Sequence, residues 1–146
     1  MERAIAEPSA RLVAEAMTTA VVTVAPGASV EAARRLARAL GAHHLLVIDE
    51  GTLVGILCRC DLDEAEPGSE VSDCMSVPVM TIPPDASLAA AVATMADFEV
   101  GCLPVVAGGL IMGVLSEDEL ARAGTAAPGA AGRCRCHRRT RLPAAR

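Results

Sequence analysis

Residues 55–62 read GILCRCDL, and residues 113–120 read GVLSEDEL. Each stretch predicts the end of a buried strand that runs directly into the first turn of a helix. Each also places a small polar side chain three residues before a carboxylate, Cys58 before Asp61 and Ser116 before Glu119. The rest of the chain is organised around these two stretches.

The two stretches belong to an internal repeat, because positions 55 and 113 differ by 58 and the same offset relates many other positions. Turn residues, caps and buried positions agree without a gap, including Ser29 with Ser87 and Met17 with Met75. Each repeat predicts the order strand, helix, strand, strand, helix. One such repeat is too small to bury its own sheet, so we expect an α/β pair of β-α-β-β-α repeats packed with pseudo-twofold symmetry.

The element boundaries follow from periodicity, turn residues and caps. Ser29 is a good N-cap and Gly41 a good stop for a helix over 30–40. The expected turn is 49–51, and 64–69 is expected to be a linker. The remaining expected elements of the first repeat are a short helix over 10–17, strands over 21–24, 44–48 and 53–57, and a helix that begins at 58.

Composition limits the kind of partner. The chain has 146 residues, 52% of them hydrophobic, but one Phe and no Tyr or Trp. It therefore has no set of rings on which single-stranded bases could stack. The formal charge is −5, and all the acidic residues lie before position 120, so the body offers no general phosphate-binding surface. We expect no nucleic-acid partner.

The sequence also predicts a location. The N-terminus has no apolar run of the signal-peptide kind, and no stretch has the length of a membrane span. The 6 Cys are then better explained as reduced thiols than as a disulfide framework. We expect a cytoplasmic protein without a membrane partner.

The expected domain plan has a flexible N-terminus over 1–8, repeats over 9–66 and 67–123, and a disordered tail rich in Ala, Gly and Arg over 124–146. Cys134, Cys136 and His137 lie in that tail. They offer three metal ligands where a closed zinc site needs four. We therefore predict no metal site and no resident cofactor, and keep a thiol- or metal-responsive protein as an alternative.

The repeated pattern resembles the CBS domain, named after cystathionine beta-synthase, present here as one tandem pair. The resemblance rests on MT or MS at 17–18 and 75–76, on VTVAP and MTIPP around the first strand, and on GCLPVV at 101–106. It also rests on the two stretches at 55–62 and 113–120, and it covers about 13–121. It implies a regulatory module rather than an enzyme. Such pairs commonly bind adenosyl ligands (AMP, ADP, ATP or S-adenosylmethionine) between repeats, and they often form homodimers.

Carried onto this chain, the resemblance implies two ligand sites. Asp61 would accept the ribose hydroxyls of the first site with Cys58 near the phosphate, and Glu119 and Ser116 would take these roles in the second. Arg59 would be a phosphate cation, as would the two His residues of the second site. The adenine walls would be Val77, Pro78, Val79, Cys102 and Leu103 in the first site, and Thr19, Ala20, Val21, His43 and His44 in the second.

Each implied site departs from the family pattern once. Cys58 stands where a hydroxyl is usual, and Glu119 is longer than the usual Asp. Cations are few, which favours a monophosphate or an uncharged adenosyl group over a triphosphate. A simpler interpretation needs no ligand, because a hydroxyl followed three residues later by a carboxylate is a capping box that stabilises a helix start. A ligandless scaffold or dimerisation protein is therefore the main alternative, and the expected partners are an adenosyl small molecule, a second copy of the chain and a regulated protein.

Overall fold

The computed structural model describes residues 10–125, which fold as two compact units. The first, unit 1, consists of residues 10–20 together with 81–125, and the second, unit 2, of residues 21–80. Each unit is a mixed α/β body with a small sheet and short helices, as the sequence predicts. The predictions for 1–8 and for the tail from 126 onward lie outside the described residues.

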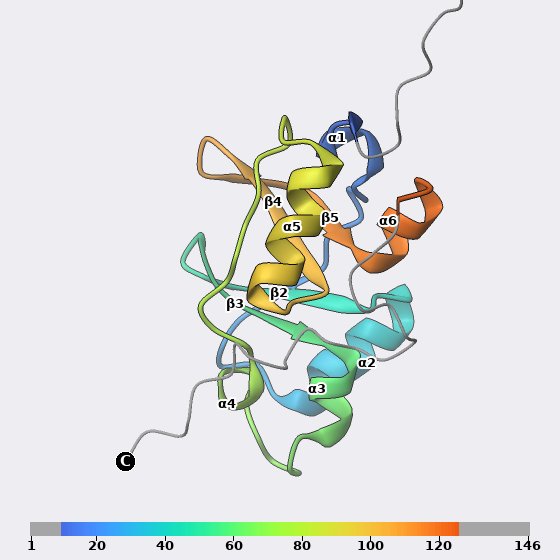
Figure 1. The fold of residues 1–146 in the computed structure, drawn as a ribbon. Helices are drawn as coiled ribbons and strands as arrows, with labels where there is room; N and C mark the ends of the chain where they lie inside the picture. The colour runs from blue at the N-terminus through green and yellow to red at the C-terminus, as the bar shows by residue number, and fades with distance from the viewer. Residues whose placement is uncertain (1–9, 126–146) are drawn as a thin grey trace, which may run out of the picture. The chain divides into compact units, whose positions relative to one another are not determined.

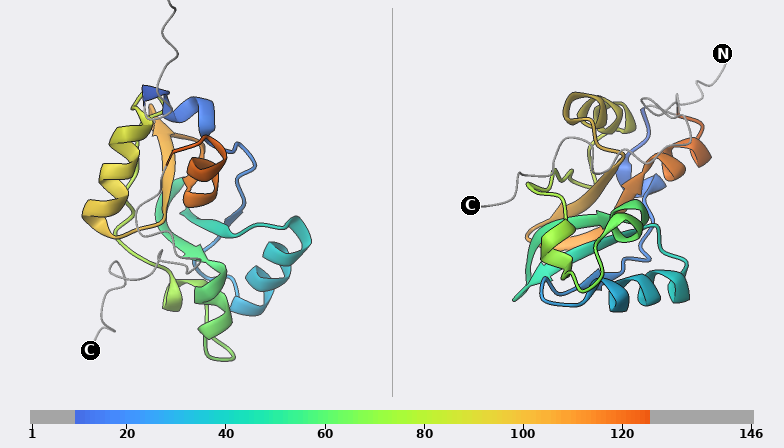
Figure 2. Two further views of the ribbon diagram at one scale, coloured as in Figure 1. Left: turned by 45° about the vertical axis from the view of Figure 1, so that its right-hand side comes forward. Right: turned by 90° about the horizontal axis from the view of Figure 1, so that it is seen from below.

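Unit 2 contains a three-stranded sheet in the order β1-β2-β3. Strand β1 is parallel to β2, and β2 is antiparallel to β3. Helices α2 and α3 pack side by side against the sheet, and α4 contacts β3 in the same unit (Figure 2). The elements are β1 (Thr23–Val24), α2 (Val30–Leu40), β2 (His44–Asp49), β3 (Thr52–Cys58), α3 (Arg59–Glu64) and α4 (Val71–Cys74).

The bounds of α2 match the sequence prediction at both ends. The Ser29 hydroxyl accepts a hydrogen bond from the Ala32 N–H at 3.0 Å, which satisfies a donor that the first turn leaves open. Gly41 ends the helix with a φ of 65°, a left-handed conformation that costs glycine little. The buried face of α2 joins one apolar core with β2, β3, α3 and α4, made of Val30, Ala33, Ala37, Leu45, Val47, Leu57, Leu62, Val71 and Cys74.

Unit 1 repeats this arrangement, and the boundaries of each of its helices and strands differ by 58 from those of the counterpart in unit 2 (Figure 1). The core positions are repeated too, since Leu88, Leu103 and Leu115 are as fully buried as Val30, Leu45 and Leu57. The offset found in the sequence is therefore exact in the structure. The elements are α1 (Val13–Ala16), α5 (Leu88–Phe98), β4 (Cys102–Ala107), β5 (Leu110–Ser116) and α6 (Glu117–Arg122).

The first strand of the second repeat is reduced to a single bridge, in which Ile82 pairs in parallel with Val105. In unit 2 the Leu46 N–H donates to the Val22 carbonyl at 2.9 Å and extends the ladder. Pro104 occupies the position of Leu46 and has no N–H to donate. The missing donor explains why the predicted first strand forms in the first repeat but not in the second. The first repeat's own strand is also shorter than the predicted 21–24.

The short helix that opens each sequence repeat packs with the body of the other repeat. In unit 1 the Val13 N–H donates to the Ala86 carbonyl at 2.8 Å, and the Leu88 N–H donates to the Arg11 carbonyl at 2.7 Å. The equivalent bonds in unit 2 run from Val71 to Ala28 and from Val30 to Ser69, at 2.8 and 3.0 Å. Each compact unit therefore contains the first helix of the other sequence repeat. The predicted domains, 9–66 and 67–123, are instead continuous in sequence. Helix α4 was not predicted from the sequence.

Both antiparallel hairpins close through two residues with positive φ, as two-residue turns of this kind require. Gly108 and Gly109 provide them between β4 and β5, with φ of 59° and 80°. Glu50 and Gly51 provide them between β2 and β3, with φ of 52° and 82°. The turn predicted at 49–51 is thus confirmed, with Glu50 in a conformation that favours glycine. Within 10–125, the longest helices are too short to cross a bilayer.

Candidate functional site

The glycine that begins each of the two opening stretches lets a connecting segment cross the last strand. Thr18 and Val114 exchange two backbone hydrogen bonds of 2.9 Å in unit 1. A Cβ on Gly113 would lie 2.5 Å from the Thr18 carbonyl oxygen, so any larger residue would push this segment away. In unit 2 the same contact joins Ile56 to Ser76, with Met75 over Gly55.

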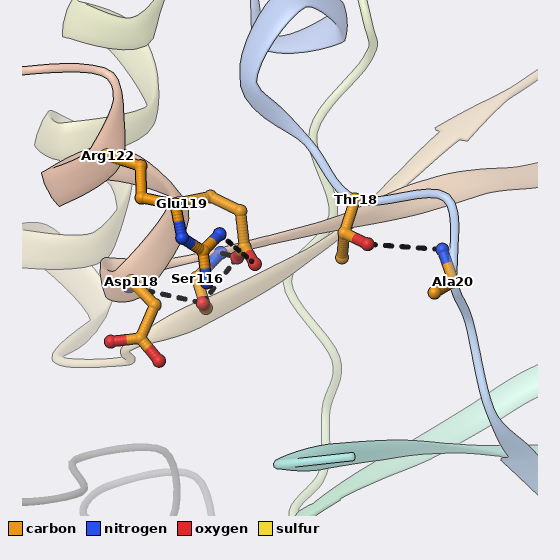
Figure 3. A network of polar contacts seen from close by, with 6 residues as sticks. All are labelled: Thr18, Ala20, Ser116, Asp118, Glu119 and Arg122. Atoms are coloured by element: carbon orange, nitrogen blue, oxygen red, sulfur yellow. Dashed lines mark hydrogen bonds and ion pairs between the residues drawn. The ribbon is translucent and has the colours of Figure 1, made fainter. Parts of the chain in front are cut away.

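In unit 1 the crossing segment lies close to the start of α6 (Figure 3). The Ser116 N–H donates to Glu119 Oε1 at 2.7 Å, and the Ser116 hydroxyl donates to the same oxygen in a short bond. The Asp118 N–H donates to the Ser116 hydroxyl oxygen at 3.3 Å. These bonds form the capping box that the sequence predicts.

The second carboxylate oxygen of Glu119 is also engaged. Glu119 Oε2 lies 3.5 Å from Arg122 Nη1, one turn further along α6. The Glu119 side chain is 11% exposed and that of Arg122 is 72% exposed. Glu119 is therefore oriented by its own helix from both sides, and any ligand that uses Oε2 competes with Arg122.

Unit 2 holds the corresponding carboxylate more deeply. The Cys58 N–H donates to Asp61 Oδ2 at 2.9 Å, and both residues are 1% exposed. The thiol of Cys58 takes the place of the Ser116 hydroxyl at the cap of α3. The capping interaction is thus present in both units, with different chemistry at the capping side chain.

The three residues expected to bind phosphate lie together in unit 2, near the end of α2. Arg59 Nη2 donates to the Ala42 carbonyl at 3.0 Å, and the Arg59 N–H donates to the His43 carbonyl at 3.0 Å. His44 pairs with Cys58 across β2 and β3. The two imidazole rings lie 5.8 Å apart, and His43 is the more exposed of the two. The Arg59 guanidinium is therefore already hydrogen-bonded to the backbone that follows α2.

Ser76 is a buried polar residue that the sequence analysis did not single out. Its side chain is 1% exposed, and its Oγ has no hydrogen-bond partner among the described residues. An unsatisfied buried hydroxyl costs free energy, so each one in a native structure calls for an explanation, and a bound ligand that hydrogen-bonds to it is one such explanation. The repeated MT and MS pairs could have drawn attention to it, because Thr18 at the matching position uses its hydroxyl to accept from the Ala20 N–H at 3.2 Å.

The remaining predicted wall residues divide between the units. Val77, Pro78 and Val79 follow Ser76 in unit 2, in the same unit as Asp61. Thr19 and Ala20 are exposed in unit 1 with Glu119. Five predicted wall residues lie in the opposite unit from the carboxylate assigned to them, and their place in a site stays a prediction. These are Val21, His43 and His44, assigned to Glu119, and Cys102 and Leu103, assigned to Asp61.

Metal ligands do not gather anywhere in the described part of the chain, where no group of three His, Cys, Asp or Glu side chains could hold an ion. Cys58, Cys74 and Cys102 are buried, and Cys60 is partly exposed. The cluster of Cys134, Cys136 and His137 lies outside the described residues, so the metal-responsive alternative is not tested by this structure.

The sequence profile of the CBS domain matches residues 13–68 and again residues 71–125. The chain belongs to the CBS domain family. The two matches coincide with the two sequence repeats, so the family resemblance drawn from the residues is confirmed.

Two curated relatives with CBS-like sequence are enzymes of much greater length. Inosine-5'-monophosphate dehydrogenase of Korarchaeum cryptofilum is 39% identical over 102 residues, which is 68% of this chain and 21% of that protein. Homoserine O-acetyltransferase of Methanococcoides burtonii is 32% identical over 114 residues, 75% of this chain and 23% of that protein. The chain spans about a fifth of each relative's length, so neither catalytic activity is carried over to it.

Two solved structures match the fold over most of the chain. The cytosolic domain of the Mg²⁺ channel MgtE, solved in complex with ATP, has a TM-score of 0.68 and 29% identity, and the match covers 77% of this chain and 48% of that one. The CBS domain pair of protein MJ0100, solved with 5'-methylthioadenosine and S-adenosyl-L-methionine, has a TM-score of 0.71 over 76% of this chain and 93% of that one. Its identity of 23% supports the fold alone.

Proposed function

We propose that this CBS pair is a regulatory module that binds an adenosyl ligand, with AMP, ADP, ATP and S-adenosylmethionine as the candidates. The ribose hydroxyls would be accepted by Asp61 in unit 2 and by Glu119 in unit 1, because ionised carboxylates accept two donors well. The complex of MgtE with ATP supports this ligand class, since that domain is 29% identical to the chain. In this proposal the module acts in the cytoplasm, as a homodimer, on a partner protein.

The observation that carries the proposal is the buried Ser76 hydroxyl. It is 1% exposed and has no partner in the described part of the chain. It directly precedes the predicted adenine wall formed by Val77, Pro78 and Val79 and lies in the same unit as Asp61. A ligand that supplies a hydrogen bond to this hydroxyl would recover a desolvation cost of about 1–3 kcal/mol that the ligand-free protein bears.

The decisive test is the Ser76→Ala variant, measured for stability and for binding. Removing an unsatisfied buried hydroxyl should raise the ligand-free free energy of unfolding by about 1 kcal/mol. The same change should weaken adenosyl binding about fivefold or more, because the ligand loses its partner. Thr18→Val, at the matching position of unit 1, is the control, and it should lower stability slightly because its hydroxyl accepts from Ala20.

A ligandless scaffold predicts a different result. Thermal unfolding of the wild-type chain would then show no shift with AMP, ATP or S-adenosylmethionine, whereas a ligand at 100 times its Kd should stabilise the protein by about 2.7 kcal/mol. In that case Ser76→Ala would raise stability with no effect on any ligand. Light scattering on the same samples tests the proposed homodimer.

A further inference from the structure

Arg122 is the last residue of α6, and its guanidinium lies beside the Ser116 and Glu119 side chains (Figure 3). Its Nη1 is 3.5 Å from Glu119 Oε2, while Glu119 Oε1 is bonded to Ser116. Because the Arg122 side chain is 72% exposed, this ion pair is weak and the guanidinium is free to turn toward another anion. An exposed cation therefore lies next to the carboxylate proposed to bind ribose.

The matching position in unit 2 carries the opposite charge. Glu64 ends α3 as Arg122 ends α6, and each follows its ribose carboxylate, Asp61 or Glu119, by three residues. Both side chains are exposed. The two halves of the repeat thus present a cation in unit 1 and an anion in unit 2 at the same point of the same scaffold.

We propose that Arg122 makes unit 1 selective for phosphorylated adenosyl ligands, while Glu64 makes unit 2 selective for adenosyl ligands without phosphate. The inference rests on the proposed function, in which Glu119 and Asp61 bind ribose. When the ribose hydroxyls reach Glu119 Oε2, they displace Arg122, whose guanidinium then pairs with the phosphate as a bidentate donor. At Glu64 a phosphate meets a like charge, which favours uncharged ligands such as adenosine.

The test compares AMP with adenosine, which differ only in the phosphate. Both are titrated by calorimetry at low salt into the full wild-type chain and into Arg122→Glu, which copies the charge of Glu64. AMP affinity should fall about tenfold while adenosine affinity stays within about twofold. Arg35→Glu, on the exposed face of α2, changes net charge equally and should leave the ratio of the two affinities unchanged.

A second variant, Glu64→Arg, should raise AMP affinity relative to adenosine by a similar factor. Equal losses of AMP and adenosine in Arg122→Glu would mean that Arg122 only orients Glu119, and would overturn the inference while leaving the adenosyl proposal intact. An unchanged ratio in Arg122→Glu would overturn it as well. If the wild-type chain binds neither compound, the proposed function fails and the charge selectivity fails with it.

Discussion

Gly113→Ala should destabilise the protein much more than Gly55→Ala, although the two glycines are equivalent in the repeat. A Cβ at position 113 would lie 2.5 Å from the Thr18 carbonyl oxygen, which accepts from the Val114 N–H at 2.9 Å, while the Thr18 N–H donates to the Val114 carbonyl at 2.9 Å. A Cβ at position 55 would instead meet the Met75 side chain, whose Cγ would be 2.9 Å away. Methionine has three rotatable bonds and can turn aside.

The magnitude follows from these contacts. Overpacking costs about 1–3 kcal/mol, and loss of the two bonds between Thr18 and Val114 costs about 1 kcal/mol each. Replacing glycine by alanine stabilises the protein by about 0.4–1 kcal/mol, because alanine lowers the conformational entropy of the unfolded chain. We therefore expect about 3 kcal/mol of destabilisation for Gly113→Ala. Gly55→Ala should cost about 1 kcal/mol, because only a flexible side chain must move.

The assay is urea unfolding followed by circular dichroism, with Gly27→Ala as the control. Gly27 has no atom within 4 Å of its would-be Cβ and no positive φ, so its substitution should be neutral or slightly stabilising. Equal destabilisation at positions 55 and 113 would refute the reasoning, because it would mean that the backbone contact of Thr18 has no special cost. A neutral Gly113→Ala would refute it too.

Three further predictions concern single residues. Ser87→Ala removes the hydroxyl that accepts from the Ala90 N–H at 3.0 Å and should cost about 1 kcal/mol in urea unfolding; an unchanged midpoint would contradict the capping role. Glu99→Gly, which copies Gly41 at a C-cap where φ is 55°, should raise stability by about 0.5 kcal/mol, and a loss would show that the left-handed strain is absent. Asp61→Ala should weaken adenosyl binding more than Glu119→Ala does in calorimetry, because Glu119 is already paired with Arg122; equal losses would contradict this ranking.

The repeat itself was readable from the sequence because its signals are local. Ser29 and Gly41 fix the ends of α2 through the caps of a single helix, and the same chemistry recurs 58 residues later. Because the two repeats align without a gap, each helix or strand assigned in one repeat predicts the same element in the other. Fold class and family could therefore be predicted before any tertiary contact was known.

Features that depend on tertiary contacts were not predicted. A periodic pattern cannot tell whether the helix over 13–16 packs on its own repeat or on the other, because the pairing residues are equivalent in both. For this reason the sequence could not predict that each first helix packs on the other repeat. The loss of the first strand in unit 1 was predictable in principle, since Pro104 lacks an N–H, but only once its strand partner is known.

The candidate site was predicted in part. The capping pairs of Cys58 with Asp61 and of Ser116 with Glu119 follow from a spacing of three residues. The ion pair of Arg122 was missed because exposed charges have no fixed partner in a sequence. The unsatisfied Ser76 hydroxyl was missed because burial of a small polar residue in a connecting segment depends on what covers it.

The most direct test of the account is a calorimetric titration of the full chain with AMP, ATP and S-adenosylmethionine, using GMP as the control. The account predicts a saturable heat with at least one adenosyl compound, a smaller or absent heat with GMP, and loss of most of the adenosyl heat in Asp61→Ala. Absence of heat with all three adenosyl compounds, from protein that circular dichroism shows to be folded, would contradict it and leave a ligandless CBS scaffold.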